Sequence, residues 1–412
     1  MEVVYECCGG LDVHAKTVVA CLITQDQKER RTFSTMTDDL LRLADWLVNA
    51  GCTHGAIEST GVYWKPVFNI LEGRMDVILV NARHVKAVPG HKTDARDSVW
   101  LADLLRHGLL KASFIPPRHM RDLRALTRYH ASVLRDQSAV ANRIQQVIES
   151  GNMKLGQVAS DALGVSGRAM LRALAAGETD ATMMADVARK SLRRKKPALV
   201  RARDGRLTDT QRWVLGELLA RYDELEAALA RVEGHIRQAL EESPDPCVAE
   251  AVPLLDTIPG VGEQVAQTIV AEIGVEMTRF PSAEHLASWA GLCPGNHESA
   301  GKRKSGKTTK GSPFLRAALV QAAWAASHRR GTYLAAQYHR LVKRMGKKKA
   351  LVAVAHSLLA IVYHMLSRHT RYVDRGEDVF KRRSVQAQSQ RLIRQLAALG
   401  VTVTVEERAD AA

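Results

Sequence analysis

The strongest periodicity in the sequence lies in residues 211–241, where apolar side chains recur at alternating spacings of four and three. This spacing lines one face of a helix and is typical of a coiled-coil seam. The seam consists of Leu218, Tyr222, Leu225, Leu229, Val232, Ile236 and Ala239. Residues 117–150 have the length and the apolar stripe of a second long helix. We therefore expect two long helices, which pair either antiparallel within one chain or between two copies of the chain.

The N-terminal region, residues 1–115, carries the alternating and helical patterns of an α/β domain. β-Branched runs on either side of a polar VHAKT segment predict two hairpin strands within residues 3–23, with Asp12 near the turn. The order that follows is strand, helix, strand, helix, strand, helix, which predicts a mixed sheet with helices packed on its faces. We place these elements at residues 31–36, 38–50, 54–58, 60–73, 75–80 and 98–110.

The rest of the chain divides into three regions by composition. Residues 116–250 are expected to form a helical linker and coiled coil, with a basic cluster at 189–197. Residues 251–373 predict an all-α domain, which a helix-breaking SPDPC segment separates from the preceding helix. Residues 374–412 form a polar C-terminal tail, with one helix near 380–398 and a short strand at 402–406.

A helix–turn–helix pattern opens the third region, with its turn at PGVG. This sequence pattern is typical of a helix-hairpin-helix motif. Gly260 and Gly262 would let backbone N–H groups approach a phosphate, which also faces the N-terminus of the second helix. A compact turn without a ligand is the alternative interpretation.

Basic residues are concentrated in one part of the chain. Lys and Arg number 59 against 44 Asp and Glu, which gives a formal net charge of +15. Between Ser299 and Val373 Lys and Arg recur throughout, whereas Asp and Glu do not occur. A solvated basic surface normally carries interspersed acids that limit self-repulsion. Their absence indicates a polyanionic partner, although an ordinary basic face remains the alternative.

Six cysteines show neither a C-x-x-C pair nor the spacing of zinc ligands, so we expect buried, reduced thiols in a cytosolic protein. The start of the chain contains charges, such as Glu2, Glu6 and Lys16, that a signal peptide lacks. The most apolar run covers residues 350–366 and holds two histidines. It is short for a membrane span of about 20 residues, and we expect a buried helix, no membrane association and a cytoplasmic location.

Four acids of the first domain form a candidate metal site. Asp12 lies at a strand turn, Glu58 at the end of a strand, and Asp94 and Asp97 at a helix start. Acids in these places can converge at one edge of a sheet. Clustered carboxylates repel one another unless a hard cation neutralises them, and Mg²⁺ is the usual ion, with Mn²⁺ as a second choice. The alternative is two helix-capping aspartates and two unrelated surface acids.

Residues 301–308 read GKRKSGKT, which matches the phosphate-binding P-loop pattern. A P-loop needs a strand before it and a helix that begins at its GK[ST], whereas a helix and a Pro-Gly loop precede this segment. The next helix is expected only at Ser312-Pro313. We therefore expect these residues to contact a different phosphate. The cationic side chains here are Lys302, Arg303, Lys304, Lys307 and Lys310.

Several ordered motifs carry a resemblance to a known family. GLDVHAKT, IESTGVYW, KTDARDS, PGVG, WAGLCPG and HESAGK, spread over about residues 5–370, resemble the one-ten family of bacterial insertion-sequence transposases. These are DEDD serine recombinases, which include the pilin-gene invertases. The resemblance implies an RNase H-like (RuvC-like) N-terminal domain and a C-terminal transposase domain with a nucleophilic serine.

The resemblance also assigns roles to residues and partners. It implies that Asp12, Glu58, Asp94 and Asp97 form the acidic tetrad, and it matches Ser299, in ESAGK, to the nucleophile. Ala300 departs from the glycine that is commoner there, and Ser305, also followed by Gly-Lys, is a competing candidate. The resemblance further implies donor DNA, target DNA and a structured noncoding RNA, a bridge RNA, that pairs with both.

Three functions are compatible with these features. The first is an RNA-guided recombinase that cuts and rejoins DNA through a phosphoserine link, acting as a dimer or tetramer associated with the nucleoid. The second is a two-metal nuclease of the Holliday-junction-resolving type, in which water attacks. The third is a nucleic-acid scaffold without catalytic activity. The basic, serine-bearing domain favours the first.

Overall fold

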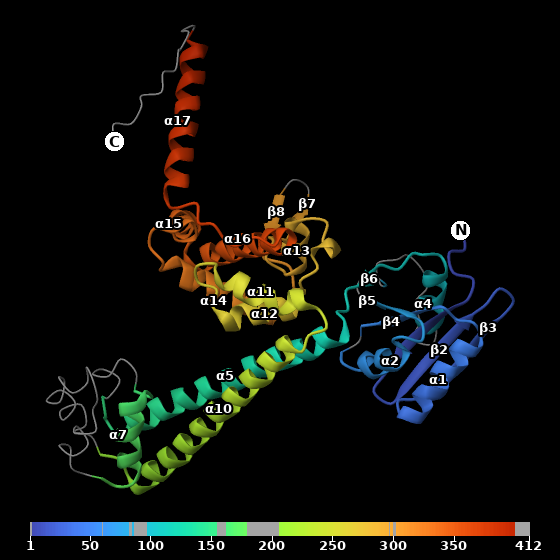
Figure 1. Ribbon diagram of the computed structural model, residues 1–412, viewed down its shortest axis with the longest axis horizontal. Coiled ribbons are helices and arrows are strands. Elements are labelled where there is room, and N and C mark those ends of the chain that lie inside the picture. Colours follow the sequence, from blue (N-terminus) through green and yellow to red (C-terminus); the bar gives the residue numbers. More distant parts are fainter. Residues whose placement is uncertain are drawn as a thin grey trace. The chain divides into compact units, whose positions relative to one another are not determined.

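The computed structural model of the chain divides into two compact units, Met1–Pro116 and Pro117–Ala412, which we call the N-terminal and C-terminal units. The structure describes residues 2–59, 61–81, 85, 97–154, 162–178, 206–295, 297–299 and 302–399. Figure 1 shows the elements of both units. Each unit is described separately.

The N-terminal unit is built on a mixed sheet of six strands in the order β3-β2-β1-β4-β5-β6. Strands β3, β2 and β1 pair antiparallel, β1, β4 and β5 pair parallel, and β6 closes the far edge antiparallel to β5. The strands are β1 (Cys8–Val13), β2 (Thr17–Ile23), β3 (Lys28–Ser34), β4 (His54–Glu58), β5 (Asp76–Val80) and β6 (Ala112–Ser113).

Helices cover both faces of this sheet (Figure 1). Helices α1 (Thr37–Asn49) and α2 (Trp64–Leu71) bury their apolar stripes with Leu11 and Ile57 in one core. Helix α4 (Asp97–Arg106) packs on the other face, against Cys8 and Ala56. The mixed sheet and the predicted order of strands and helices are confirmed, and the structure adds only the short β6 to the predicted strands.

Gly10 determines how closely α4 lies on the sheet. A Cβ atom at Gly10 would collide with the backbone oxygen of Ser98 and the backbone nitrogen of Ala102, which belong to α4. Only glycine therefore allows the helix backbone to contact strand β1 directly. The neighbouring Gly9 faces α1, and a Cβ there would meet Leu47 at an ordinary 3.4 Å.

We expect Gly10→Ala to destabilise the protein by about 1–3 kcal/mol or more, because overpacking must push α4 off the sheet. Gly9→Ala is the matched control on the same strand, and it should be nearly neutral. Urea denaturation followed by far-UV circular dichroism measures both. Equal effects of the two variants would contradict the close contact between α4 and β1.

The C-terminal unit is mainly helical, with one short sheet. Its described elements are α5 (Arg118–Ser150), α7 (Val165–Ala175), α10 (Asp209–Glu241), α11 (Pro246–Asp256), α12 (Glu263–Ile273), a 3-10 turn at Met277–Arg279, α13 (Ala283–Trp289), β7 (His297–Ser299), β8 (Lys302–Ser305), α14 (Pro313–Ser327), α15 (Tyr333–Met345), α16 (Lys347–Arg368) and α17 (Asp378–Ala398). The basic cluster at 189–197 and the strand expected at 402–406 lie outside the described residues.

The two long helices α5 and α10 pair antiparallel within the chain (Figure 1). The start of α5, at Leu123, packs with the end of α10, at Ile236, whereas Ile144 packs with Leu215. The middle of the predicted seam is confirmed, because Leu225, Leu229, Val232 and Ile236 are buried. Its ends are displaced: Leu215, Leu219 and Leu240 are buried, whereas Leu218, Tyr222 and Ala239 are only partly buried. Of the two pairing alternatives, the structure contains the intramolecular one. A capping box begins α10: the Thr208 side chain accepts from the Gln211 N–H, and the Gln211 side chain reaches back.

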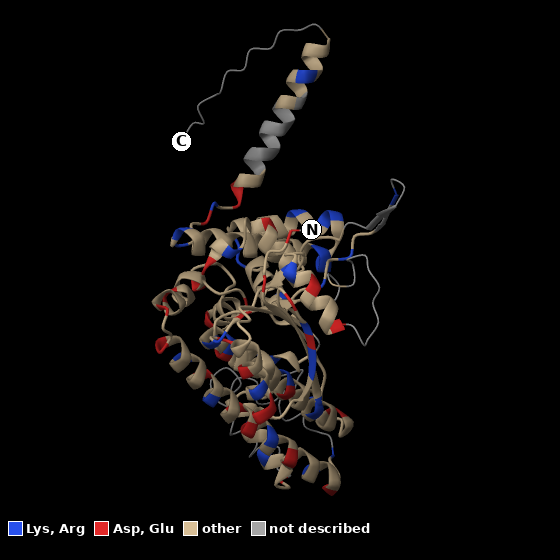
Figure 2. Ribbon diagram, turned by 90° about the vertical axis from the view of Figure 1, so that its right-hand side faces the viewer, with Lys and Arg blue, Asp and Glu red and all other residues tan. Residues whose placement is uncertain are grey.

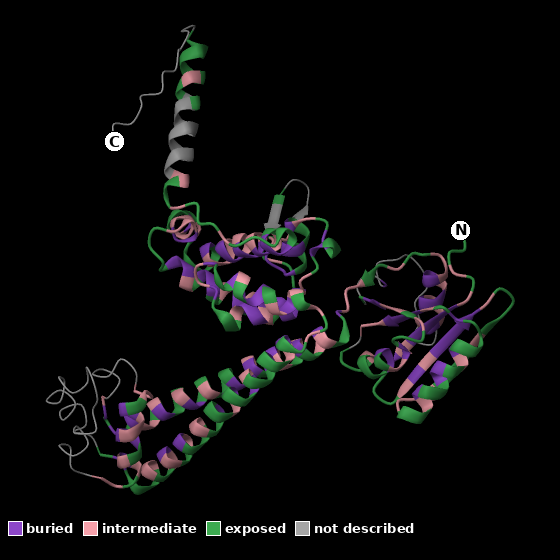
Figure 3. Ribbon diagram, in the orientation of Figure 1, coloured by how far each residue is buried: buried purple, intermediate pink, exposed green. Residues whose placement is uncertain are grey.

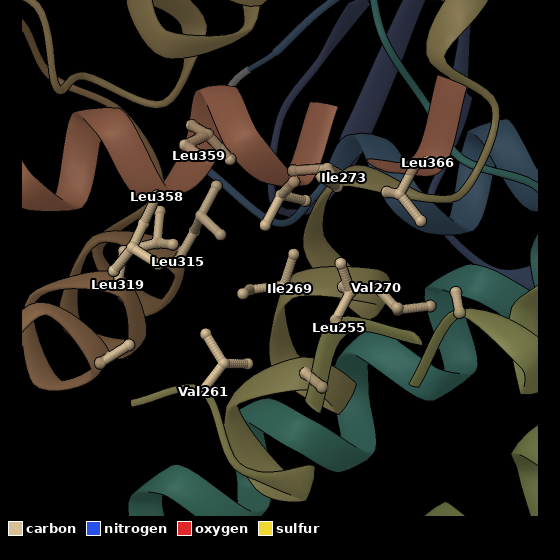
Figure 4. Packing of buried hydrophobic residues seen from close by; sticks show 14 of the residues in the cluster. Leu255, Val261, Ile269, Val270, Ile273, Leu315, Leu319, Leu358, Leu359 and Leu366 are labelled. Atoms are coloured by element: carbon tan, nitrogen blue, oxygen red, sulfur yellow. The ribbon is translucent and has the colours of Figure 1, made fainter. Parts of the chain in front are cut away.

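Helices α11 to α16 enclose one apolar core around α16 (Figures 3 and 4). Helix α16 is long and apolar enough to cross a membrane by length and composition alone. Its side chains Leu358, Leu359 and Leu366 are instead buried against α12 and α14, as expected for a core helix. Figure 4 also shows Val261, from the predicted PGVG turn, inside this core.

The prediction of an all-α C-terminal domain is wrong in one respect. Strands β7 and β8 pair antiparallel, so the segment that was expected to be a loop is a hairpin. The sequences HES and KRKS lack an apolar alternation, so nothing in them predicts the two strands, which pair with each other.

A buried ion pair ties α5 to the core of this unit. The Glu272 side chain, at the end of α12, is only 1% exposed and accepts two hydrogen bonds from Arg128, of 2.7 and 3.0 Å. The neighbouring Arg124 donates to the backbone oxygens of Ala271 and Glu272, which a helix end leaves without intrahelical partners. The Arg128 guanidinium also lies over the Phe314 ring of α14 at 5.0 Å.

Removal of the Glu272 charge leaves Arg124 and the partly exposed Arg128 without a carboxylate partner, and we expect Glu272→Gln to lower stability by about 1.5–3 kcal/mol. The exposed pair of Glu276 and Arg279 provides the control, because Glu276→Gln should cost at most about 1 kcal/mol. Chemical denaturation of the full chain measures both values. Similar losses for the two variants would show that Glu272 does not hold α5 in place.

Candidate active site

Asp12, the next-to-last residue of β1, and Glu58, the last residue of β4, occupy matching positions in two neighbouring parallel strands. Strands β1 and β4 are paired in register up to Leu11 and Ile57, so the next residue of each strand is an acid. Neighbouring strands lie about 4.8 Å apart. The register therefore brings the two acidic residues to one edge of the sheet.

Both acids belong to the face of the sheet that α4 covers. Side chains alternate between the two faces of a strand. Cys8, four residues before Asp12, and Ala56, two residues before Glu58, both pack against α4. Asp12 and Glu58 therefore share the α4 face.

The N-terminus of α4 lies toward the same edge. The Cys8 thiol donates to the Ala102 carbonyl oxygen, while Gly10, further along β1, contacts the earlier residue Ser98. Helix α4 thus runs antiparallel to β1, and its first residue, Asp97, lies toward the end of β1 that carries Asp12. We call Asp12, Glu58 and Asp97 the acidic edge. Asp94 lies outside the described residues.

Asp12 has a neighbour that the sequence-based prediction missed. Its Oδ2 lies 3.2 Å from Nε2 of His14, and the His14 and Asp12 side chains are 59% and 15% exposed respectively. His14 follows Asp12 by two residues, and side chains two residues apart lie on the same side of a strand. The sequence alone could therefore have predicted that His14 lies beside Asp12. The His14 ring nitrogen is thus placed within hydrogen-bonding distance of the Asp12 carboxylate.

The acidic edge has the donor chemistry of a hard-cation site. Carboxylate oxygens are the ligands that Mg²⁺ and Mn²⁺ prefer. Among the described residues, however, no group of three or more His, Cys, Asp or Glu side chains lies close enough together to hold a metal ion. The described acids fit such an ion by type and by their common edge, and the fourth predicted ligand falls outside the described residues.

Ser299 ends the first strand of the β7–β8 hairpin. It pairs with Lys302, the first residue of β8, while His297 pairs with Ser305 at the base. A register shift separates His297 from Glu298. The hairpin thus places Ser299 beside its turn and Ser305 at its base.

The base of the hairpin is anchored to the helical core. The Gly295 N–H donates to the Lys307 carbonyl oxygen at 2.9 Å, and Pro294 bridges to Thr308. Arg316 of α14 donates both to the Thr308 hydroxyl at 2.7 Å and to the Gly291 carbonyl oxygen. Arg316 was not among the predicted site residues, because nothing local in the sequence connects it with the hairpin.

These contacts exclude a nucleotide-binding P-loop for GKRKSGKT. The segment runs along a strand and then a coil, and α14 begins only at Pro313, with Ser312 as its N-cap. The Thr308 hydroxyl, which would bind a metal ion in a P-loop, accepts from Arg316 instead.

The two candidate serines differ in what the hairpin requires of them. The Ser305 hydroxyl accepts from the Lys307 N–H at 3.2 Å and so helps to form the turn after β8.

A cysteine near the base of the hairpin is not a competing nucleophile. Burial, with a smaller effect from Glu284, raises the pKa of the Cys293 thiol, which therefore remains neutral.

Exposed cations accompany the hairpin. Lys302, Lys307 and Lys310 are solvent-exposed. Figure 2 shows how Lys and Arg are distributed along the ribbon. The backbones of Arg303 and Lys304 belong to β8, and their side chains lie outside the described set. A cationic segment next to a serine suits a phosphodiester substrate, because attack on phosphorus concentrates negative charge on the phosphate oxygens.

The PGVG turn joins α11 to α12, and its two predicted glycines have different roles. Gly260 has φ +89°, and a Cβ there would lie 2.5 Å from the Ala322 oxygen and the Ala326 nitrogen of α14. Close packing therefore accounts for Gly260. Gly262 is the exposed N-cap of α12, with open space where a Cβ would stand. Phosphate binding at this turn stays a prediction.

Comparisons with known proteins match regions in both units of the chain. A family model described as Transposase matches residues 9–152, and one described as Transposase IS116/IS110/IS902 family matches residues 252–340. The pilin gene-inverting protein of Moraxella lacunata is 24% identical over 377 residues, which cover 87% of this chain and 95% of the relative.

Two further relatives come from insertion sequences. The transposase for insertion sequence element IS1111A of Coxiella burnetii is 21% identical, over 71% of this chain and 72% of its own length. The insertion element IS110 uncharacterized 43.6 kDa protein of Streptomyces coelicolor is 27% identical, over 70% of this chain and 74% of its own length.

Fold, sites and relatives together define an enzyme of DNA transposition and recombination. The two matched regions cover more than half of the chain, which belongs to the IS110 family of transposases.

Proposed function

We propose that the chain recombines DNA by transesterification, with Ser299 as the nucleophile. The observation that carries this proposal is the position of Ser299, which ends β7 beside the hairpin turn and pairs with Lys302. Ser299 also begins the stretch up to Val373 that is rich in Lys and Arg and contains no Asp or Glu. Because these cations do not form a nucleotide-binding loop, they are available to a strand of nucleic acid.

The proposed reaction exchanges one phosphodiester for another. The Ser299 oxygen loses its proton to a base, forms a bond to phosphorus, and breaks one of the two bonds between that phosphorus and the deoxyribose oxygens. The released hydroxyl takes up a proton. The phosphoserine link conserves the bond energy, so a second strand's hydroxyl can reverse the step and rejoin DNA without a nucleotide cofactor.

We further propose that the N-terminal unit is an RNase H-like domain whose acidic edge serves the same reaction. Mg²⁺, when bound by Asp12, Glu58, Asp94 and Asp97, would lower the pKa of a hydroxyl or water and neutralise phosphate charge. The carboxylates would hold and orient that ion, and His14 would compete with it for Asp12. The edge acts on Ser299 of its own subunit or of a neighbouring one, in a dimer or tetramer.

The proposal includes guidance by a structured noncoding RNA that pairs with donor and target DNA. It rests on the family resemblance and on the acid-free basic stretch, which suits any polyanion. Purification from the native host followed by sequencing of co-purified RNA tests it, and RNA from the element's own flank is the expected result.

Ser299→Ala should abolish the covalent protein–DNA adduct, whereas Ser305→Ala should keep it, because Ser305 serves the turn. The assay incubates protein with a labelled plasmid that carries the element and its flanks, together with the RNA transcribed from them. Denatured adducts are then detected by gel retardation that protease removes.

The same assay separates the hydrolytic alternative. A two-metal nuclease would leave Ser299→Ala able to cut and would form no adduct with any variant. A scaffold without catalytic activity would leave the DNA uncut in every case. Either result would replace the recombinase proposal.

Binding of the cation can be measured without activity. Ligand at a hundred times its Kd stabilises a folded protein by about 2.7 kcal/mol. We expect MnCl₂ to raise the Tm of the full chain, and Asp12→Asn or Glu58→Gln to remove most of that increase. Asp45→Asn, at an exposed pair with Arg74, is the control and should keep it. An unchanged Mn²⁺ response in Asp12→Asn would remove Asp12 from the metal site.

A further inference from the structure

A pocket of about 730 Å³ lies between the second half of α16 and the segment 370–375 that follows it. Ligand pockets for small organic molecules have volumes of roughly 300–1,000 Å³, so this one is large enough for a nucleotide. Ala360, Ile361 and Met365 contribute to its lining, together with Tyr372 and with Tyr333, whose ring stacks on Phe380 at 5.0 Å.

The segment that closes the pocket is fixed by Asp374. Its Oδ1 accepts hydrogen bonds from the backbone N–H groups of Tyr333 at 3.0 Å and Gly376 at 2.7 Å. Its Oδ2 accepts from the Tyr372 hydroxyl at 3.1 Å, and the Tyr372 N–H donates to Thr257. The pocket wall is therefore built before any ligand arrives, which lowers the entropic cost of binding.

The lining contains basic residues and no acid. Arg368, Arg371 and Arg375 line it together with His356 and His364. Two carboxylates lie nearby, and both are engaged. Asp374 holds the wall, and Glu284 of α13 has its pKa lowered by a hydrogen bond with Ser282 and by those two histidines.

We infer that this pocket binds an unpaired nucleotide of single-stranded nucleic acid. Arginine guanidinium groups match phosphate oxygens in bidentate geometry, and aromatic and apolar walls accept the face of a base. A free phosphate would leave the apolar walls unused, and a base inside a duplex cannot enter a pocket of this kind without leaving its stack.

Such a site would serve strand exchange, because strands that are cut and rejoined in new pairs pass through an unpaired state. The inference rests on the proposed function only in that the protein handles nucleic acid. It does not depend on Ser299, and none of the pocket residues belongs to the hairpin or the acidic edge.

The test measures binding of full-length protein to fluorescent 20-nucleotide single strands, one of RNA and one of DNA, and to the matching DNA duplex. The variant Arg368→Gln/Arg371→Gln removes two exposed arginines and spares the core. Arg329→Gln/Arg330→Gln removes two exposed arginines of the same basic stretch that do not line the pocket.

We expect the pocket variant to lose about tenfold or more in single-strand affinity and no more than about twofold in duplex affinity, since the two guanidinium–phosphate contacts that hold the nucleotide in the pocket are lost. Its log–log salt slope on single strands should fall by roughly 1.4, which corresponds to two phosphate contacts. The control variant should change single-strand and duplex binding alike. The RNA and DNA strands show which nucleic acid the pocket prefers.

Three results would overturn the inference. Equal losses on single strands and duplex would make these arginines part of a general basic surface. Unchanged single-strand binding by the pocket variant would show that the pocket does not bind a nucleotide. Displacement of single strands by polyglutamate at matched charge would indicate a site for an acidic peptide. Ser299→Ala should bind single strands like the wild type, so failure of the nucleophile assignment and failure of the pocket are distinguishable.

Discussion

The buried carboxylate of Glu272 connects the parts of the C-terminal unit on which its function depends. Taking a carboxylate out of water is costly, and Arg128 offsets that cost with two hydrogen bonds while Arg124 satisfies the end of α12. Because both arginines belong to α5, the long helical hairpin is held rigidly against α12. Arg128 also contacts Phe314 at the start of α14, the helix that anchors the serine hairpin through Arg316.

In the N-terminal unit a glycine, rather than an ion pair, determines how the elements that carry the candidate site residues pack together. The missing side chain of Gly10 lets α4 lie directly on β1, and the parallel pairing of β1 with β4 aligns Asp12 with Glu58. The close contact at Gly10 and the register of β1 with β4 therefore bring Asp12, Glu58 and Asp97 to one edge of the sheet. The proposed retention of a divalent cation depends on this common edge, because the three acids come from three different elements.

Much of the fold was predictable because it is encoded locally. Alternation predicted the strand that ends at Glu58, and the heptad predicted α10 together with the middle of the face that it buries, from Leu225 to Ile236. The partner of that face was not predictable, since a seam does not specify whether a helix of the same chain or of another copy covers it. The β7–β8 hairpin was missed because KRKS has no strand propensity of its own and depends on Arg316.

The roles of single residues were likewise predictable where they depend on the local sequence, and were not predictable where they depend on contacts far along the chain. The phosphate-binding role of Gly260 stays a prediction, and the structure adds a packing role that no local pattern contains: its close neighbours are Ala322 and Ala326 of α14, far along the chain. His14 could have been found from alternation alone, because it follows Asp12 by two residues. Ser299 came from a motif match, and its position on the hairpin is what makes a nucleophilic role testable.

Cleavage in H₂¹⁸O tests the central claim most directly, because transesterification and hydrolysis differ in the source of the oxygen that joins the phosphate. In transesterification the serine oxygen attacks and a DNA hydroxyl later displaces it. Mass spectrometry of the rejoined strands should therefore find no ¹⁸O at the new junction. One ¹⁸O atom on the terminal phosphate of each cut strand would show that water attacks, and would contradict a phosphoserine intermediate.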